Sequence, residues 1–114
     1  MLPLLIAVFS SSSWSRPSPL DGSWSGEFIG NAGMVSFRTH FWLENDEIKG
    51  IIDFPQEKVI GLELSWIIIE SSSIHFEVTK NSEVLVFEGK LINNKIIGDF
   101  KAKTGHGTFD LSRN

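Results

Sequence analysis

From residue 20 onward the chain alternates apolar and polar side chains with a period of two, and turn residues interrupt the alternation every eight to twelve positions. Alternation of this kind places one set of side chains on each face of a β-strand, whereas an amphipathic helix repeats every 3.6 residues. No segment after residue 20 shows the helical period. The pattern therefore predicts an all-β protein of about eight short strands.

The expected connections between these strands are short, as at residues 30–33 and 93–94. Short turns join antiparallel neighbours, because a parallel pair needs a long crossover. A meander of eight strands closes most naturally into a small up-and-down barrel of lipocalin-like shape. Sharp coiling of its strands would be permitted by glycines on the expected inner faces, at Gly26, Gly50, Gly89 and Gly98.

The length of 114 residues allows one hydrophobic core, and we expect a single β-barrel domain over residues 20–114. Residues 1–19 differ from the rest, because an apolar run is followed by serines and prolines. This composition predicts a signal-like or flexible segment that is too short to span a bilayer. It slightly favours a periplasmic or secreted location over a cytoplasmic one, and no transmembrane segment is expected.

Charge and composition argue against several classes of partner. The formal net charge of −4 opposes a phosphate backbone, so nucleic acid is not an expected partner. The absence of cysteine excludes a disulfide framework, a thiol nucleophile and a cysteine zinc site. His40, His75 and His106 are far apart in the sequence and should face outward on separate strands. We therefore expect neither a metal nor a cofactor.

The sequence contains no recognisable catalytic constellation. Residues 22–26 have the glycine spacing of a nucleophile elbow, but Trp24 occupies the position that requires serine. Ser23 and Ser25 are expected on a solvated strand face. Asp53 and Asp99 lie near strand ends without a pocket signal, and solvation explains both. The module itself is therefore predicted not to be an enzyme.

Five segments occur in an order that resembles a known domain: residues 22–26, 50–56, 87–91, 97–100 and 109–113. This order is similar to the N-terminal β domain that precedes the catalytic domain of some bacterial α/β-hydrolases of the esterase and serine-peptidase type. The resemblance extends over nearly all of the predicted barrel. It implies a non-catalytic accessory module that packs on a serine hydrolase. The resemblance allows either a fragment of a longer enzyme or the product of a gene that has lost or never had its hydrolase half.

A second, architectural resemblance concerns the two ends of the predicted barrel. Gly22 and Trp24 are similar to the Gly-x-Trp at the start of lipocalins, in which a late arginine packs on the tryptophan ring. The resemblance implies that Arg113 takes this part here. A guanidinium over an indole ring is a favourable cation–π contact.

The strand phases predict which large side chains point inward. An eight-stranded barrel is narrow, so a filled interior is favoured over a ligand cavity. If a cavity exists, the same side chains would line it. They are Trp24, Phe28, Phe37, Phe41, Trp66, Phe76, Phe87 and Phe100.

Several apolar residues fall out of phase with this inner set, which is unusual for a barrel whose outside faces water. If they cluster, they form a docking face for an α/β-hydrolase catalytic domain, for a second copy of the chain or for the N-terminal segment. The residues assigned to this face are Trp42, Ile51, Ile67, Ile69, Val84 and Val86, and Ile97 is out of phase as well.

Two functions therefore stand as alternatives at the level of sequence. The first is an accessory β-barrel that packs on a catalytic partner or dimerises. The second is a free-standing, lipocalin-like carrier of a small hydrophobic ligand. A filled interior with an apolar outer face supports the first, whereas an aromatic-lined cavity supports the second.

Overall fold

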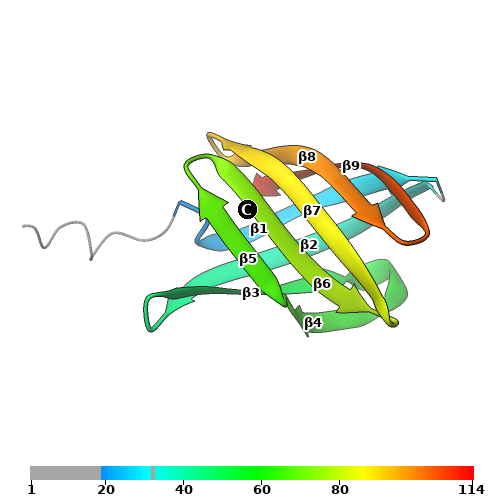
Figure 1. Ribbon diagram of the computed structural model, residues 1–114, viewed down its shortest axis with the longest axis horizontal. Coiled ribbons are helices and arrows are strands. Elements are labelled where there is room, and N and C mark those ends of the chain that lie inside the picture. Colours follow the sequence, from blue (N-terminus) through cyan, green and yellow to red (C-terminus); the bar gives the residue numbers. More distant parts are fainter. Residues whose placement is uncertain (1–18, 32) are drawn as a thin grey trace, which may run out of the picture.

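A computed structural model describes residues 19–31 and 33–114 and is an all-β barrel (Figure 1). The first eighteen residues of the predicted signal-like segment lie outside the described part. The strands are β1 (Gly22–Gly30), β2 (Gly33–Glu44), β3 (Glu47–Phe54), β4 (Val59–Glu63), β5 (Trp66–Glu70), β6 (Ser73–Lys80), β7 (Glu83–Ile92), β8 (Lys95–Ala102) and β9 (Gly105–Arg113). A 3-10 turn, η1 (Pro55–Glu57), separates β3 from β4.

The nine strands form one antiparallel sheet in the order β4-β3-β2-β1-β9-β8-β7-β6-β5. Strands that follow one another in the chain pair in space, except β4 and β5, which are the two edges. The first and last strands also pair, with Trp24 opposite Arg113 and Ile29 opposite Thr108. This pairing joins the two halves of the chain into one coiled sheet (Figure 1). The predicted up-and-down β-barrel is confirmed.

The alternation of apolar residues at positions 62, 64, 66 and 68 predicts one strand with these side chains inward. The main chain divides this segment in two at Leu64 and Ser65. The Leu64 amide donates to the Gly50 carbonyl at 2.9 Å, whereas the Ser65 amide donates to the Glu77 carbonyl at 2.9 Å. Consecutive amides thus bond to opposite neighbours, and the chain leaves β3 to join β6. The structure consequently has nine strands where about eight were expected.

The break also shifts the phase of β5, and four predicted positions were wrong. Trp66 and Ile68 were expected in the interior, but their exposed fractions are 55% and 41%. Ile67 and Ile69 were expected on the outer face, but both pack against the core. Two consecutive residues at the break turn toward neighbouring strands on opposite sides, so alternation counted from Leu64 assigns every later β5 side chain to the wrong face.

The other predicted interior aromatics are in the core. Phe28 is partly buried and the remainder are buried, with ring contacts that run through the barrel. Phe76 stacks on Phe87 at a centroid distance of 4.8 Å, and Phe87 meets Phe109 edge to face at 5.3 Å. These contacts place aromatic side chains where a carrier would hold its ligand. The buried members of the predicted set are Trp24, Phe37, Phe41, Phe76, Phe87 and Phe100.

Arg113 packs on the Trp24 ring, as the resemblance to lipocalins implied. Its guanidinium lies over the Trp24 ring, 4.3 Å from the ring centroid, and donates to the carbonyls of Asp21 and Pro19. The Trp24 indole N–H donates to the Leu20 carbonyl at 2.9 Å. The chain before β1 is therefore tied to the last strand by both side chains.

Residues 52–56, which belong to one of the segments that carry the hydrolase-domain resemblance, have a structural role. Asp53 Oδ1 accepts a hydrogen bond of 2.7 Å from the Gly61 amide, and its other oxygen lies 3.2 Å from the Arg38 guanidinium. Gln56 Oε1 accepts from the Ser36 amide at 3.0 Å. These bonds hold η1 and the start of β4 against β2. They account for the side chains in this segment without invoking catalysis.

Two of the predicted barrel glycines lie where strands approach closely. A Cβ on Gly26 would stand 1.8 Å from the Asp110 carbonyl oxygen, and one on Gly98 would stand 2.0 Å from that of Glu88. Any larger residue would force the strands apart.

Across residues 19–31 and 33–114, no helix is long and apolar enough to cross a membrane.

Candidate functional site

Exposed apolar side chains lie on β5 and β8, on the outer surface of the barrel. Trp66 and Ile68 on β5 point outward, and Ile68 is 41% exposed. Ile97 on β8 is 50% exposed, in agreement with its predicted outward phase. Ile68 and Ile97 are on the two sides of an outer groove of about 470 Å³, which also contains His75, Glu88, Lys90 and Asp99.

Cross-strand register places a polar row inside this groove. Ile68 pairs with His75, His75 with Glu88, and Glu88 with Asp99, so the four side chains follow one another across β5, β6, β7 and β8. In the next row, Lys90 pairs with Ile97 and its ammonium donates to Ser73 Oγ at 2.7 Å. The groove is therefore a mixed surface, with exposed isoleucines on its two sides and polar and charged side chains between them.

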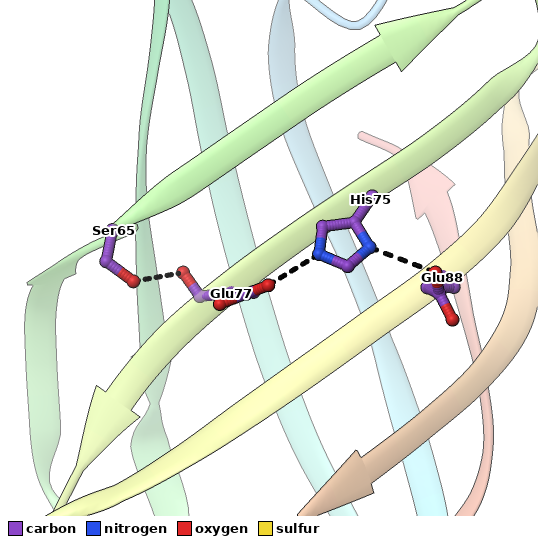
Figure 2. A network of polar contacts seen from close by, with 4 residues as sticks. All are labelled: Ser65, His75, Glu77 and Glu88. Atoms are coloured by element: carbon purple, nitrogen blue, oxygen red, sulfur yellow. Dashed lines mark hydrogen bonds and ion pairs between the residues drawn. The ribbon is translucent and has the colours of Figure 1, made fainter.

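His75 is held between two carboxylates (Figure 2). Its Nε2 lies 2.6 Å from Glu77 Oε2, and its Nδ1 lies 3.0 Å from Glu88 Oε2. The hydrogen bond to Glu77 is the main cause of a raised pKa for His75, and Glu88 adds to it. Protonated His75 donates through both nitrogens, which leaves no lone pair for a general base. The cluster is thus a cross-strand tie.

Ser23 and His40 form a contact that the sequence did not indicate. Ser23 Oγ lies 2.8 Å from His40 Nδ1, across the pair β1 and β2. A serine–histidine pair is the first element of a nucleophilic site. A third, orienting group is missing within the described residues, because the nearby Asp53 is bonded to Arg38 and Gly61 instead. Ser23 faces outward as expected, and it bonds to His40 at this exposed position.

The three histidines do not converge. His40 is on β2, His75 on β6 and His106 on β9. Over the described part of the chain, no group of three or more His, Asp or Glu side chains has the geometry to hold a metal ion. Asp53 on β3 and Asp99 on β8 are likewise on separate parts of the sheet.

A slot of about 370 Å³ separates β3 from β5. Residues 47–49 form one wall and pair only with β2, since the pairing of β3 with β4 begins at Ile51. Residues 64–68 form the other wall, and β5 pairs only with β6. Both walls consequently present main-chain edges without a strand partner among the described residues. Trp66 and Ile68 line the outer side of this slot.

The predicted docking residues do not form one surface. Trp42 and Ile51 lie on the outer faces of β2 and β3, whereas Val84 and Val86 lie on the outer face of β7. In the sheet, β1, β9 and β8 separate these two pairs. One sequence feature could have indicated the break before β5, which leaves Trp66 and Ile68 exposed. This feature is Ser65, a polar residue between two apolar runs.

Comparisons with known proteins give a fold and no family. No family model matches the chain, and no curated protein matches it. Among solved structures, the chain is similar to a redesigned β-barrel, with a TM-score of 0.68 and 12% sequence identity. The match covers 83% of this chain and 91% of the designed one. At this identity the likeness shows the architecture alone.

Proposed function

We propose that this chain is a non-catalytic accessory β-barrel that binds an extended strand of a partner protein in the slot between β3 and β5. The observation that carries the proposal is the pair of unpartnered strand edges flanked by the exposed Trp66 and Ile68. The resemblance of the sequence to domains that precede hydrolases makes an α/β-hydrolase catalytic domain the proposed partner.

Unpaired edges favour strand addition as the mode of binding. A strand edge presents a row of free N–H and C=O groups, and an extended segment can satisfy them while its side chains provide specificity. Trp66 and Ile68 are on the same face of β5, so they would contact alternate side chains of the added strand. Lys49 and Glu47 form an ion pair of 3.2 Å on the opposite wall, which favours a mainly uncharged segment.

The packing of the interior favours partner binding on the outer surface and disfavours a carrier that holds its ligand in the middle of the barrel. Phe28, Phe37 and Phe87 contact one another at centroid distances of 5.9 Å or less, in the middle of the barrel. A ligand in this space would have to displace buried aromatic side chains. Such displacement costs about 3–5 kcal/mol for each ring that leaves the core.

Site-specific photo-crosslinking in the source cells tests the proposed partner. The crosslinking amino acid p-benzoylphenylalanine replaces Ile68 in one variant and the exposed β1 residue Glu27 in a matched control. Captured proteins are then probed with a biotinylated fluorophosphonate, which labels active serine hydrolases. We expect a labelled hydrolase on the Ile68 variant and none on the control.

Two outcomes would overturn this proposal. Capture of only a second copy of the chain at Ile68 would replace the hydrolase with self-association. Equal capture at Ile68 and Glu27 would show that the slot has no selectivity. The native polypeptide should also be sized with an antibody against residues 20–114, because a fused hydrolase would be captured within the same molecule.

The non-catalytic part of the proposal has its own test at Ser23. Without an orienting carboxylate, the Ser23–His40 pair should not activate the hydroxyl, so the purified chain should not react with a fluorophosphonate. Labelling is read by intact-protein mass spectrometry, with a known serine hydrolase as the positive control. Adduct formation that disappears in both Ser23→Ala and His40→Gln variants would contradict the proposal.

A further inference from the structure

The mouth of the barrel at the β1–β2 turn contains a cavity of about 310 Å³ that shares no residue with the β3–β5 slot. Its floor is formed by Phe28 and Phe100, whose rings meet edge to face at a centroid distance of 4.4 Å. Val35, Leu85 and Ala102 complete the apolar lining. The cavity therefore lies above the aromatic core.

Glycine keeps this mouth open. Gly30, Gly33 and Gly105 line it without side chains. A Cβ on Gly30 would stand 2.8 Å from Phe100 Cζ, so the β1 backbone passes directly over the floor. A Cβ on Gly33 would meet nothing within 4 Å, which shows that the space beside it is open. Side chains at these positions would narrow or close the mouth.

The charged groups at the rim are already paired within the protein. Lys80 Nζ lies 2.7 Å from Glu57 Oε1 and 5.3 Å from the centroid of the Phe54 ring. Glu83 accepts hydrogen bonds from the amide and hydroxyl of Thr104 at 2.9 and 2.7 Å. Glu57, Lys80 and Glu83 together leave one net negative charge at the rim, which disfavours an anionic ligand.

Two polar side chains at the rim are available to a ligand. Asn31 and His106 line the cavity, and neither side chain has a hydrogen-bond partner among the described residues. An amide and an imidazole offer both donors and acceptors. Their position at the rim would let them bond one polar group of a molecule whose apolar part rests on Phe28 and Phe100.

We infer that this mouth is a binding site for a small uncharged molecule with an apolar ring or short chain and one polar group. The volume is at the lower end of the range of about 300–1,000 Å³ found for ligand pockets. A few polar groups over an apolar floor are also typical of such sites. The inference is independent of the proposed partner, because the slot and the mouth can be altered separately.

Binding of the neutral fluorescent probe N-phenyl-1-naphthylamine to the purified chain tests the inference. We expect saturable one-to-one binding that weakens at least tenfold in Ala102→Phe, because the larger side chain fills the mouth. The matched control Ile68→Ser alters the outer groove and should leave the affinity unchanged. The anionic analogue 1-anilinonaphthalene-8-sulfonate should bind several-fold more weakly, since Glu83 leaves the rim with a net negative charge after Lys80 has paired with Glu57.

A second measurement on the unmodified chain avoids dependence on the folding of Ala102→Phe. Methyl resonances of Val35, Leu85 and Ala102 should shift on addition of the neutral probe, while those of Ile68 and Ile97 should not. Shifts confined to the two isoleucines would assign the probe to the outer groove and overturn the inference. Absence of saturable binding, or equal affinity for the sulfonate, would also overturn it.

Discussion

At the scale of single residues, the side chains that carry the resemblance hold the barrel together. Trp24 and Arg113 join the first strand to the last through a cation–π contact, and Arg113 Nε also donates to Asn94 Oδ1 at 3.1 Å. Asp53 and Gln56 secure the turn after β3. Their roles are explained by folding, so functional residues have to be sought among side chains that the fold leaves unused.

One buried residue is a candidate for stabilisation. Thr39 is 2% exposed, and its hydroxyl has no hydrogen-bond partner among the described residues. Because an unpaired buried hydroxyl is costly, Thr39→Val should raise the free energy of unfolding by about 1 kcal/mol. Urea denaturation measures the change, and exposed Thr108→Val serves as the control. A loss of stability in Thr39→Val would show that the hydroxyl has a partner such as bound water.

The His75 cluster predicts a pH dependence of stability. The pKa of His75 is raised above its ordinary value of 6.5, mainly by the hydrogen bond to Glu77, so the folded state favours the protonated ring. The resulting stabilisation is full below pH 6.5 and is lost as the pH rises through the folded-state pKa. Urea denaturation measures the free energy of unfolding at pH 5.5 and at pH 8. Between these two pH values, this free energy should decrease less for His75→Gln than for the unmodified chain. Equal decreases would contradict the prediction.

At the scale of elements, β5 is the strand whose environment matters most for the proposed partner. It has one strand neighbour, and the Ser65 amide anchors its start to Glu77. Its inward side contributes Ile67 and Ile69 to the core, whereas its outward side leaves Trp66 and Ile68 in solvent. One short strand thus serves both the core and the exposed surface.

Adjacent isoleucines in β5 allow a matched test of its phase. Ile69→Ser removes a side chain that packs on the core and should lower the free energy of unfolding by about 1–2 kcal/mol. Ile68→Ser alters an exposed side chain and should change it by less than about 0.5 kcal/mol. Thermal and urea denaturation compare the two variants. The reverse order would restore the phase expected from simple alternation.

At the scale of the whole molecule, the pairing that joins the two halves of the chain lies in the middle of the sheet, away from its two edge strands. The β1–β9 pair joins the two halves of the chain, whereas β4 and β5 remain as edges. The edges are connected through Leu64 and Ser65, whose amides bond to different strands. The barrel is therefore most rigidly connected near the chain ends and most open beside the proposed binding slot.

This asymmetry predicts the pattern of amide hydrogen exchange. Amides in β1, β8 and β9 should exchange slowest, because these strands lie in the middle of the sheet, farthest from the two edges. Amides in β4 and β5 should exchange fastest among the strands, since edge hydrogen bonds open locally at low cost. Mass spectrometry or NMR can follow the exchange. Protection of β5 equal to that of β8 would indicate that another chain covers this edge.

Local patterning was sufficient to predict most of the strands, most of the turns and most of the core, but not the division of the segment that forms β4 and β5. Alternation, Asn and Gly at turns, and Phe at inward positions are properties of neighbouring residues, so Phe37, Phe76 and Phe87 could be placed without knowing which strands meet. The contact between Trp24 and Arg113 followed from a resemblance, because no local rule links residues so far apart.

Tertiary structure alone decided the phase of β5, the Ser23–His40 contact and the shape of the mouth. Each depends on pairings between distant segments: Ser65 with β6, β1 with β2, and the turns that converge over Phe28 and Phe100. A strand's alternation specifies which side chains share a face, but only its neighbours determine which face is buried. For this reason the sequence predicted the barrel, while the pairing of distant strands determined which surfaces remain exposed at the β3–β5 slot and at the mouth.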